Sequence, residues 1–365
     1  MNNKYRFVKK LTVCTLLLCI GIAAHAQKAR KYSNEFLNIG VDAVAMGMAN
    51  SVVSSSGDVN SVYWNPAGLM QLEDQQVALM HASYFANIAQ YDYAAFAMPL
   101  DERSALGISI IRFGVDDIMN TTELIDQHGN IDYNRISLFS AADYAFVLSY
   151  ARNTPIPGLT YGVNAKVVRR IIGKFANSWG FGFDAGVQYK TNSDWMFGVM
   201  ARDITTTYNM WNINKKEYSK VQNAVEGMNQ ELPETTEITL PKLQMGVSKN
   251  VKLTRDLNML AAFALHVEFA ETNAVISSGS MSMTPSLGVE FGYANLVFVR
   301  GGVGNFQNNR QMDNTEKMEF QPNIGVGFHY KGIQVDYALT DIGDQSAAIY
   351  SNVFSLKLDL GIFRK

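Results

Sequence analysis

The sequence has few cysteines and only one long apolar run. Both of its cysteines, Cys14 and Cys19, lie within the first 26 residues, so the remainder of the chain has no thiol. That remainder therefore has no disulfide framework, no cysteine metal site and no cysteine nucleophile. After residue 26 no stretch approaches the roughly 20 apolar residues of a transmembrane helix. If the chain spans a membrane, it does so as a closed barrel, because an open sheet edge is not tolerated in lipid.

The first 26 residues are typical of a secretory signal peptide. They begin with a basic region that contains Lys4, Arg6, Lys9 and Lys10. An apolar region at residues 11–24 follows, and Ala24-His25-Ala26 has the pattern of an A-x-A cleavage site. We expect cleavage before Gln27, which removes both cysteines and places the mature chain beyond the inner membrane.

The mature chain also lacks a basic excess. The sequence has 31 basic and 33 acidic residues, and the signal segment removes four basic and no acidic ones, which leaves 27 against 33 and a net charge of about −6. This balance argues against non-specific binding of nucleic acid. The sequence contains neither a G-x-S-x-G nor a Walker A motif. We therefore expect no enzymatic activity.

Strand periodicity is the main signal that is present. From about residue 76 to residue 363 the chain consists of about fourteen segments in which apolar and polar residues alternate. In residues 179–190 the odd positions are aromatic or aliphatic, and the even positions are glycine or polar. Several such runs exceed ten residues, whereas soluble strands usually have about five or six. We interpret the fold as an all-β transmembrane barrel, with a soluble β-sandwich as the alternative.

The connections between these segments alternate in length, which is typical of outer-membrane barrels. Short turns are expected at residues 100–103, 153–157, 191–194, 250–256, 293–295 and 331–332. Longer connections are expected at residues 114–141, 203–240, 270–283, 304–319 and 340–350, with moderate ones at 84–90 and 171–177. If the N-terminus is periplasmic, every connection of the long class faces the outside of the cell.

The residues that precede the first strand have a different character. Residues 41–50 are small and apolar and predict a short helix. A rigid turn follows at Asn65, Pro66, Ala67 and Gly68, because proline fixes φ and glycine is free to adopt a positive φ. A barrel of this size would otherwise hold water. We therefore predict three parts: a signal peptide at 1–26, a lumenal hatch or plug at 27–75 and the barrel at 76–365.

Three motifs of this N-terminal part resemble a known family. Phe36-Leu-Asn-Ile-Gly40, Ala45-Met-Gly-Met48 and Trp64-Asn-Pro-Ala-Gly-Leu69 are similar to the N-terminal motif of the PorV/PorQ family, which belongs to the FadL-like outer-membrane barrels. Similar segments continue in order at residues 142–145, 197–204, 299–302 and 335–338. The resemblance implies a fourteen-stranded barrel with an N-terminal hatch in the outer membrane.

The same resemblance implies a function in type IX secretion. The chain would be a non-enzymatic partner of the translocon, or a carrier of secreted cargo. A FadL-like transporter or diffusion channel for hydrophobic small molecules is the alternative. The implied partners are outer-membrane lipid, a protein of the secretion system or its cargo and, for the channel, a lipid-like ligand. Met46, Met48, Trp64 and Leu69 would line an apolar pocket for such a ligand, or would pack as part of a plug.

Seven polar side chains on the predicted strands are expected to face the lumen. They are Lys166, Asp184, His266, Glu268, Glu290, Arg300 and Asp336. Such charges usually pair inside a membrane protein, and a substrate path is the alternative. His266 and Glu268 share one strand face, but a metal site needs three or four converging ligands. We therefore expect no metal and no cofactor.

The connection at residues 203–240 is a candidate docking loop. Tyr208, Met210 and Trp211 precede a stretch rich in charges and amides. A solvated external loop is one interpretation. The other is a protein-binding surface, because long loops carry function and these three residue types are common interface anchors.

Overall fold

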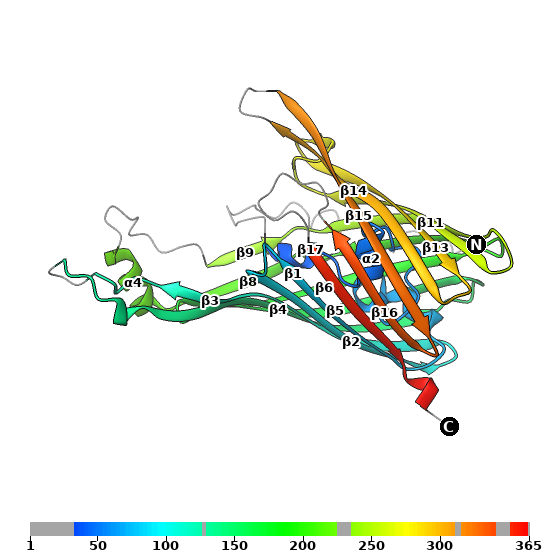
Figure 1. Cartoon of the computed structure of the whole chain (residues 1–365), viewed down its shortest axis with the longest axis horizontal. Coiled ribbons are helices and arrows are strands. Elements are labelled where there is room, and N and C mark those ends of the chain that lie inside the picture. The colour runs from blue at the N-terminus through cyan, green and yellow to red at the C-terminus, as the bar shows by residue number, and fades with distance from the viewer. Residues whose placement is uncertain (1–32, 126–128, 225–234, 311–314, 341–350, 364–365) are drawn as a thin grey trace, which may run out of the picture. The chain divides into compact units, whose positions relative to one another are not determined.

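The computed structural model describes residues 33–125, 129–224, 235–310, 315–340 and 351–363. The expected signal peptide lies outside these residues. Within the described part of the chain, no helix is long and apolar enough to cross a membrane. The described strands form one antiparallel sheet that closes on itself (Figure 1).

Fourteen of the described strands form the wall of this barrel. They are β1 Gln76–Tyr84, β2 Ala89–Asp101, β3 Ser104–Asn120, β4 Ser137–Asn153, β5 Leu159–Ile172, β6 Ala176–Lys190, β7 Trp195–Arg202, β10 Lys242–Lys252, β11 Leu257–Glu268, β13 Met281–Tyr293, β14 Val297–Arg310, β15 Glu316–Tyr330, β16 Ile333–Thr340 and β17 Ser351–Asp359. The last strand pairs with the first, with Gln76 opposite Asp359, which closes the ring. The prediction of an all-β barrel with about fourteen antiparallel strands is confirmed.

Strand β6 illustrates why these segments form a barrel wall. Phe183, Val187 and Tyr189 are exposed on the outer face, while Asp184 and Gln188 point inward and are buried. Side chains alternate between the two faces of a strand. The alternating sequence of β6 therefore gives the strand an apolar face toward lipid and a face of small or polar residues toward the lumen.

One end of the barrel has only short turns. Consecutive wall strands are joined there by residues 102–103, 154–158, 191–194, 253–256, 294–296 and 331–332. All six positions agree with the sequence-based prediction within a few residues. We call this the short-turn end and the opposite one the long-loop end.

At the long-loop end the predicted connections are partly wrong. Residues 203–240 were expected to be a loop, but they contain β8 Thr207–Ile213, helix α4 Lys215–Ala224 and β9 Thr236–Thr239. Residues 270–283 contain the short strand β12 Ile276–Ser278. The hairpins β3–β4 and β14–β15 also continue further than predicted, and most of the expected loop at 340–350 lies outside the described residues. Backbone pairing does not depend on the side chains, so these strands continue past the residues at which the sequence alternation was judged to end.

The segment that precedes β1 lies inside the barrel. It contains the short helices η1 Glu35–Asn38, α2 Ala43–Gly47, α3 Ser61–Trp64 and η2 Pro66–Gln71. We call residues 33–75 the lumenal segment. Several glycines of the wall strands show where it lies, because each is in close contact with the lumenal segment. A Cβ added to any of them would overlap or press on atoms of that segment. These glycines are Gly107 of β3, Gly162 of β5, Gly186 of β6, Gly198 of β7, Gly288 of β13, Gly302 of β14 and Gly325 of β15. These strands lie around the ring, and α2 itself lies against β14, β15, β16 and β17 (Figure 1).

Apolar side chains of the lumenal segment form the core of the molecule. Val41, Met48, Val62 and Leu69 are fully buried and belong to one cluster with inward-facing wall residues such as Tyr91. Full burial of an apolar side chain of this size contributes about 1.5–3 kcal/mol. The lumenal segment is thus held by the same forces that stabilise a soluble core, although it is enclosed by a membrane barrel.

Candidate functional site

The predicted turn at Asn65 attaches the lumenal segment to the wall. The Asn65 side chain is fully buried, and its Oδ1 accepts a hydrogen bond from the backbone N–H of Ala67 at 3.2 Å, which caps helix η2. Its Nδ2 donates to the carbonyl oxygens of Val53, at 3.0 Å, and Val187 of β6, at 3.2 Å. Pro66 occupies the first position of η2, where its missing N–H costs nothing. One side chain therefore joins two parts of the lumenal segment to strand β6.

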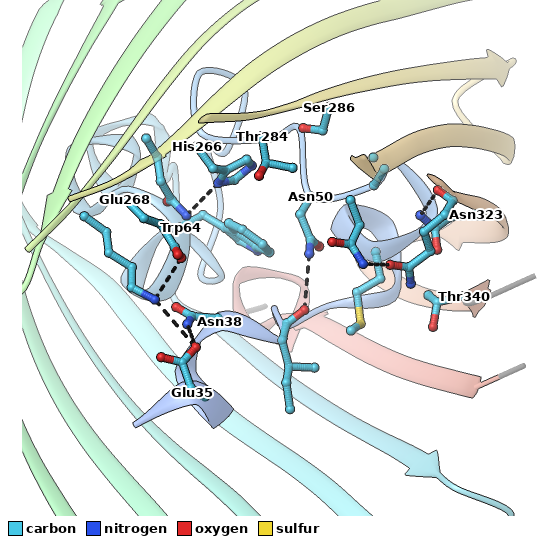
Figure 2. Close-up of a pocket in the computed structure, with 18 of the residues that line it drawn as sticks. Glu35, Asn38, Asn50, Trp64, His266, Glu268, Thr284, Ser286, Asn323 and Thr340 are labelled. Atoms are coloured by element: carbon cyan, nitrogen blue, oxygen red, sulfur yellow. Dashed lines mark hydrogen bonds and ion pairs between the residues drawn. The ribbon is translucent and has the colours of Figure 1, made fainter. Parts of the chain in front are cut away.

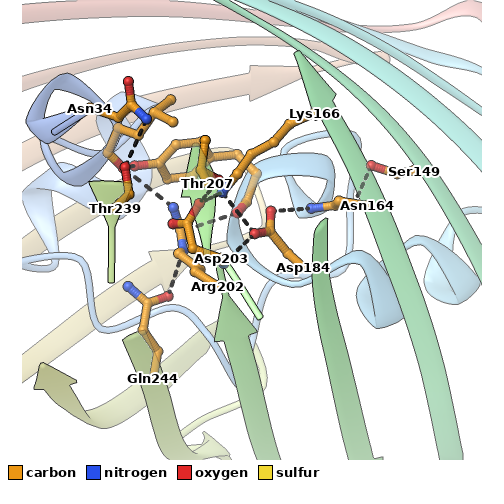
Figure 3. A network of polar contacts seen from close by, with 12 residues as sticks. Asn34, Ser149, Asn164, Lys166, Asp184, Arg202, Asp203, Thr207, Thr239 and Gln244 are labelled. Carbon is orange, nitrogen blue, oxygen red and sulfur yellow. Dashed lines mark hydrogen bonds and ion pairs between the residues drawn. The ribbon is translucent and has the colours of Figure 1, made fainter. Parts of the chain in front are cut away.

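A buried charge cluster lies where strand β7 ends (Figure 3). Lys166 Nζ lies 2.8 Å from Asp184 Oδ1 and 2.7 Å from Asp203 Oδ1. The backbone N–H of Asp203 also donates to Asp184, at 2.8 Å, and the Thr207 hydroxyl donates to Asp203. Lys166 and Asp184 were predicted to face the lumen, and the structure brings them together. Asp203 was missed because it had been assigned to a loop.

Arg202, the neighbour of Asp203, binds the lumenal segment directly. Its guanidinium donates to the carbonyl oxygens of Tyr63, at 2.9 Å, and Leu37, at 3.3 Å. It also lies over the Tyr63 ring, 4.3 Å from the centroid. Sequence reasoning missed this residue too, although it lies in the segment 197–204 that resembles the family. The end of β7 therefore binds the lumenal segment by hydrogen bonds and a cation–π contact.

A second polar cluster lies across the lumen. Arg300 of β14 forms ion pairs with Glu290 of β13 and, at 2.7 Å, with Asp336 of β16. His329 Nε2 lies 3.4 Å from the same Asp336 carboxylate. The structure thus places three of the predicted lumenal charges, Glu290, Arg300 and Asp336, in one inward-facing group.

The lumenal segment contributes two acidic residues beside this second cluster. Asp58 pairs with Lys357 of β17, and Asp42 Oδ1 accepts a hydrogen bond from the Ser355 hydroxyl at 2.9 Å. Burial raises the pKa of Asp42 to about 7, with a further rise from the nearby Asp58 and Asp336 charges. Asp42 lies in a stretch that the sequence predicted only as a small apolar helix. Its hydrogen bond to Ser355, which connects the lumenal segment to β17, was therefore not predicted.

A cavity of about 490 Å³ lies between the lumenal segment and the long-loop ends of the strands (Figure 2). His266 Nδ1 lies 3.1 Å from the Gln244 amide nitrogen, and Glu268 pairs with Lys242 at 3.0 Å. Both predicted residues line the cavity, and each interacts with the residue directly opposite on β10. Of the four residues considered for an apolar pocket, Met46 and Trp64 line this cavity, whereas Met48 and Leu69 are fully buried in the core.

The predicted docking residues lie on a strand and not in a loop. Tyr208 and Met210 point outward from β8 and are 57% and 63% exposed. Trp211 has the opposite orientation and lies under the Arg170 guanidinium, 5.1 Å from its ring centroid. The structure therefore separates Trp211 from the other two residues, because neighbouring side chains of a strand face opposite sides.

More than half of the chain matches the sequence model of one protein family. Residues 23–218, which are 196 of the 365 residues, match the sequence model of the family described as type IX secretion system protein PorV. The chain belongs to the PorV family. The barrel and the family together make it an outer-membrane protein. No curated protein matches the chain.

Solved structures with a similar fold are FadL-like barrels. The CymD monoaromatic hydrocarbon channel has 12% sequence identity and a TM-score of 0.55, with 87% of this chain and 97% of that one covered. The Pseudomonas putida toluene transporter TodX has 12% identity and a TM-score of 0.53, with 87% and 96% covered. A Pseudomonas aeruginosa FadL homologue has 11% identity and a TM-score of 0.50, with 87% and 98% covered. Identity this low shows a shared fold alone.

Proposed function

We propose that this PorV-family protein is a non-enzymatic outer-membrane component of type IX secretion that binds the translocon or secreted cargo. The observation that carries the proposal is the family match over residues 23–218. Two further elements belong to it. Residues 1–26 are cleaved as a signal peptide, and the long-loop end faces the outside of the cell, where a secreted protein would meet it.

The outer face of β8 is the proposed docking surface. Tyr208 and Met210 lie directly opposite Phe181 and Trp179 of β6, and all four side chains are exposed. Aromatic residues and methionine are enriched at the centres of protein interfaces. Beyond them β8 leads to helix α4, whose first residues are Lys215, Lys216 and Glu217. An apolar patch beside a charged rim is the usual composition of a binding surface.

The alternative function is a FadL-like channel for hydrophobic molecules. The shared fold with hydrocarbon and toluene transporters supports it, as does a cavity beside the lumenal segment. The composition of that cavity argues against it. Its lining includes Asn38, Asn50, Gln244, Gln321 and Asn323, whose amides would lose hydrogen bonds beside a hydrocarbon.

The test is recovery of partners from native outer membranes. A tagged copy is extracted in mild detergent, and co-purifying proteins and lipids are identified by mass spectrometry. We expect a large translocon barrel or secreted cargo with the wild-type protein. Replacement of Tyr208 and Met210 by serine should reduce this recovery about tenfold or more, since such anchors dominate interface energy.

The matched control is Met318→Ser on β15, because Met318 is 57% exposed on the outer face of another extended hairpin. This variant should recover the same partners as the wild type. Deletion of residues 210–236 should also abolish recovery and leave a heat-modifiable barrel. Equal recovery by all variants would contradict the docking proposal. Recovery of the protein alone, with a stoichiometric apolar ligand, would favour the channel.

A further inference from the structure

The apolar outer face of β5 ends at a charged residue. Tyr161 and Val163 are exposed on this face, and every second residue after them continues it as far as Arg169. Arg169 is eight positions beyond Tyr161, which at about 3.3 Å per residue corresponds to about 26 Å of strand. Because barrel strands are tilted by about 40°, this length spans roughly 20 Å of the membrane, close to the apolar band of about 25 Å in such barrels. Arg169 therefore lies at the edge of the lipid-facing band on the long-loop side.

Two aromatic residues flank Arg169 on the neighbouring strands. Tyr144 of β4 and Trp179 of β6 are its direct cross-strand partners, so the three side chains share the outer face. Trp179 is 46% exposed, and the Arg169 guanidinium lies over its ring, 4.6 Å from the centroid. Tyrosine and tryptophan are enriched where the hydrocarbon of a membrane meets the headgroups. The aromatic neighbours therefore also place Arg169 at the level of the lipid headgroups.

The Arg169 guanidinium has donors that the protein does not use. Its Nη1 donates to Asn177 Oδ1 at 2.8 Å and to the carbonyl oxygen of Ser178 at 3.3 Å. Nε and Nη2, which form one edge of the group, have no hydrogen-bond partner among the described residues. Neither of them belongs to the described polar atoms that are buried without a partner, so both are accessible to solvent. Such an edge matches two oxygen atoms of a carboxylate or a phosphate.

The arginine on the other side of Tyr144 is already paired. Arg112 of β3 is also a direct cross-strand partner of Tyr144. Its Nη2 lies 2.8 Å from Asp116 Oδ2, and its Nη1 lies 3.7 Å from Asp92. The described partners of Arg169, in contrast, are two neutral groups and an aromatic ring. Arg169 is therefore the arginine of this row whose charge the described residues leave uncompensated.

Three lysines lie beyond this row, on the side away from the apolar band. Lys174 is in the turn between β5 and β6, and Lys215 and Lys216 begin α4. The backbone N–H of Asn214 donates to the carbonyl oxygen of Phe175 at 2.8 Å, which joins the start of α4 to that turn. All three lysines are exposed, and none of them is paired with a carboxylate in the described part of the chain. They extend the positive charge into the headgroup region.

We propose that Arg169 and these lysines bind the phosphate of a lipid headgroup in the membrane leaflet at the long-loop end. Phosphate supplies the pair of oxygen atoms that the free edge of Arg169 requires, and it is an anionic group at this level of a membrane. The positive charge is local, because the chain after residue 26 carries a net charge of about −6. The site needs no secretion partner and no particular orientation in the membrane, so it stands independently of the function proposed above.

The test is native mass spectrometry of the purified full-length protein in dodecylmaltoside, an uncharged detergent, with added lipid. The probes are dioleoyl phosphatidic acid and dioleoylglycerol, which have the same acyl chains and differ in the phosphate. Inorganic phosphate and a hexaglutamate peptide are competitors that carry no acyl chain. The first phosphatidic acid should bind about tenfold or more tightly than dioleoylglycerol, because charge-assisted hydrogen bonds are the strong ones. Neither competitor should displace it at equal concentration.

Three variants connect this binding to the basic residues. Arg169→Gln should weaken binding of the first phosphatidic acid about tenfold, because it removes both the charge and the free edge of the guanidinium. Arg169→Lys should recover only part of the affinity, since lysine keeps the charge but has no planar fork. Lys174→Gln combined with Lys215→Gln should cause a smaller loss, because these side chains contribute through their charge alone.

The matched control is Lys249→Gln. Lys249 also lies over a tryptophan, 4.8 Å from the Trp195 centroid, but Trp195 begins β7 at the short-turn end. This variant has the same change of charge at a similar cation–aromatic pair, and it should bind phosphatidic acid like the wild type. Heat-modifiable migration verifies the folding of every variant.

Three outcomes overturn the proposal. One is equal binding of phosphatidic acid and dioleoylglycerol by the wild-type protein, a result that depends on no variant. The second is displacement of the lipid by hexaglutamate or by inorganic phosphate at equal concentration, which would assign the basic surface to an acidic protein or to a free anion. The third is unchanged affinity in folded Arg169→Gln, or an equal loss in Lys249→Gln, which would place the bound lipid elsewhere.

Discussion

Asn65 of the lumenal segment donates a hydrogen bond from Nδ2 to the carbonyl oxygen of Val187 on β6, at 3.2 Å. The same amide caps η2 and reaches Val53. Its side chain is fully buried, so no water replaces these bonds when they are lost. The attachment of the lumenal segment to the barrel wall therefore depends strongly on Asn65.

Asn65→Ala should destabilise the protein by about 2–3 kcal/mol, since it removes a helix cap and leaves buried carbonyl groups unpaired. Urea unfolding in lipid vesicles measures this, and limited proteolysis reports release of residues 33–75. Asn192→Ala, at an exposed asparagine of the turn at residues 191–194, is the matched control and should have little effect. Equal urea midpoints for the two variants would refute the anchoring role.

The Lys166 cluster predicts an unequal response to two substitutions. Lys166→Met leaves Asp184 and Asp203 as two uncompensated buried carboxylates and should cost about 3–5 kcal/mol. Asp203→Asn removes one of two carboxylates around a single lysine and leaves a neutral pair, so it should cost clearly less. Lys249→Met, on the outer face over Trp195, is the control and should cost about 1 kcal/mol or less. Unfolding midpoints test this order, and a larger loss for Asp203→Asn than for Lys166→Met would contradict it.

Asp42 predicts a pH dependence with a defined sign. Its pKa of about 7 in the folded protein lies above the ordinary value of about 3.9. Between these two values the folded state retains a proton that the unfolded state has lost, so this contribution to stability falls as pH rises from about 4 to 7 and is constant above. Asp42→Asn abolishes the titration. The stability of this variant relative to the wild type should therefore increase with pH over that window.

Urea midpoints at pH 4.5, 6 and 8 measure the Asp42 effect. The asparagine retains an oxygen that accepts the hydrogen bond from Ser355. Asp256→Asn, in an exposed turn at the short-turn end, serves as the control. A difference between Asp42→Asn and wild type that is independent of pH would contradict the prediction.

Gly162 is required because the backbone of the lumenal segment packs directly against it, and not because of its own φ angle. A Cβ at this position would lie 2.6 Å from the Pro66 carbonyl carbon and 2.7 Å from the Ala67 nitrogen. Gly162→Ala should therefore displace the turn at Pro66 and cost about 1–3 kcal/mol. Gly301→Ala is the control, because a Cβ there meets nothing within 4 Å. Faster proteolysis of residues 33–75 in Gly162→Ala alone is the expected result, and equal rates in both variants would disprove the close contact.

The sequence predicted which polar residues of the strands face inward, but it did not predict which residue each of them contacts. Alternation identified Lys166, Asp184, Arg300 and Asp336 as inward-facing residues of strands. It also placed His266 and Glu268 on one face as a candidate pair. In the structure each of these two interacts with the opposite residue of β10 instead. Cross-strand neighbours lie about 5 Å apart, whereas residues two positions apart on one strand are separated by almost 7 Å.

The sequence by itself determined the class of fold. Period-two alternation depends on residue order alone, and it indicated the wall strands and their inner and outer faces. The regular spacing of the short turns indicated the topology, and the Asn65–Gly68 turn marked the segment before the barrel. These features are local, because the physical preference of each residue for lipid, water or a bend is expressed within a few positions of the chain.

Only the tertiary structure decided which distant residues meet. The strand character of residues 207–213, the contact of Arg202 with Tyr63 and the position of Arg169 between Tyr144 and Trp179 all depend on strand register or on the path of the lumenal segment. Register is a property of the closed ring, since a shift of one residue exchanges the two faces of a strand. Local sequence preferences contain no information about the register. Packing between segments that are up to about 300 residues apart determines it.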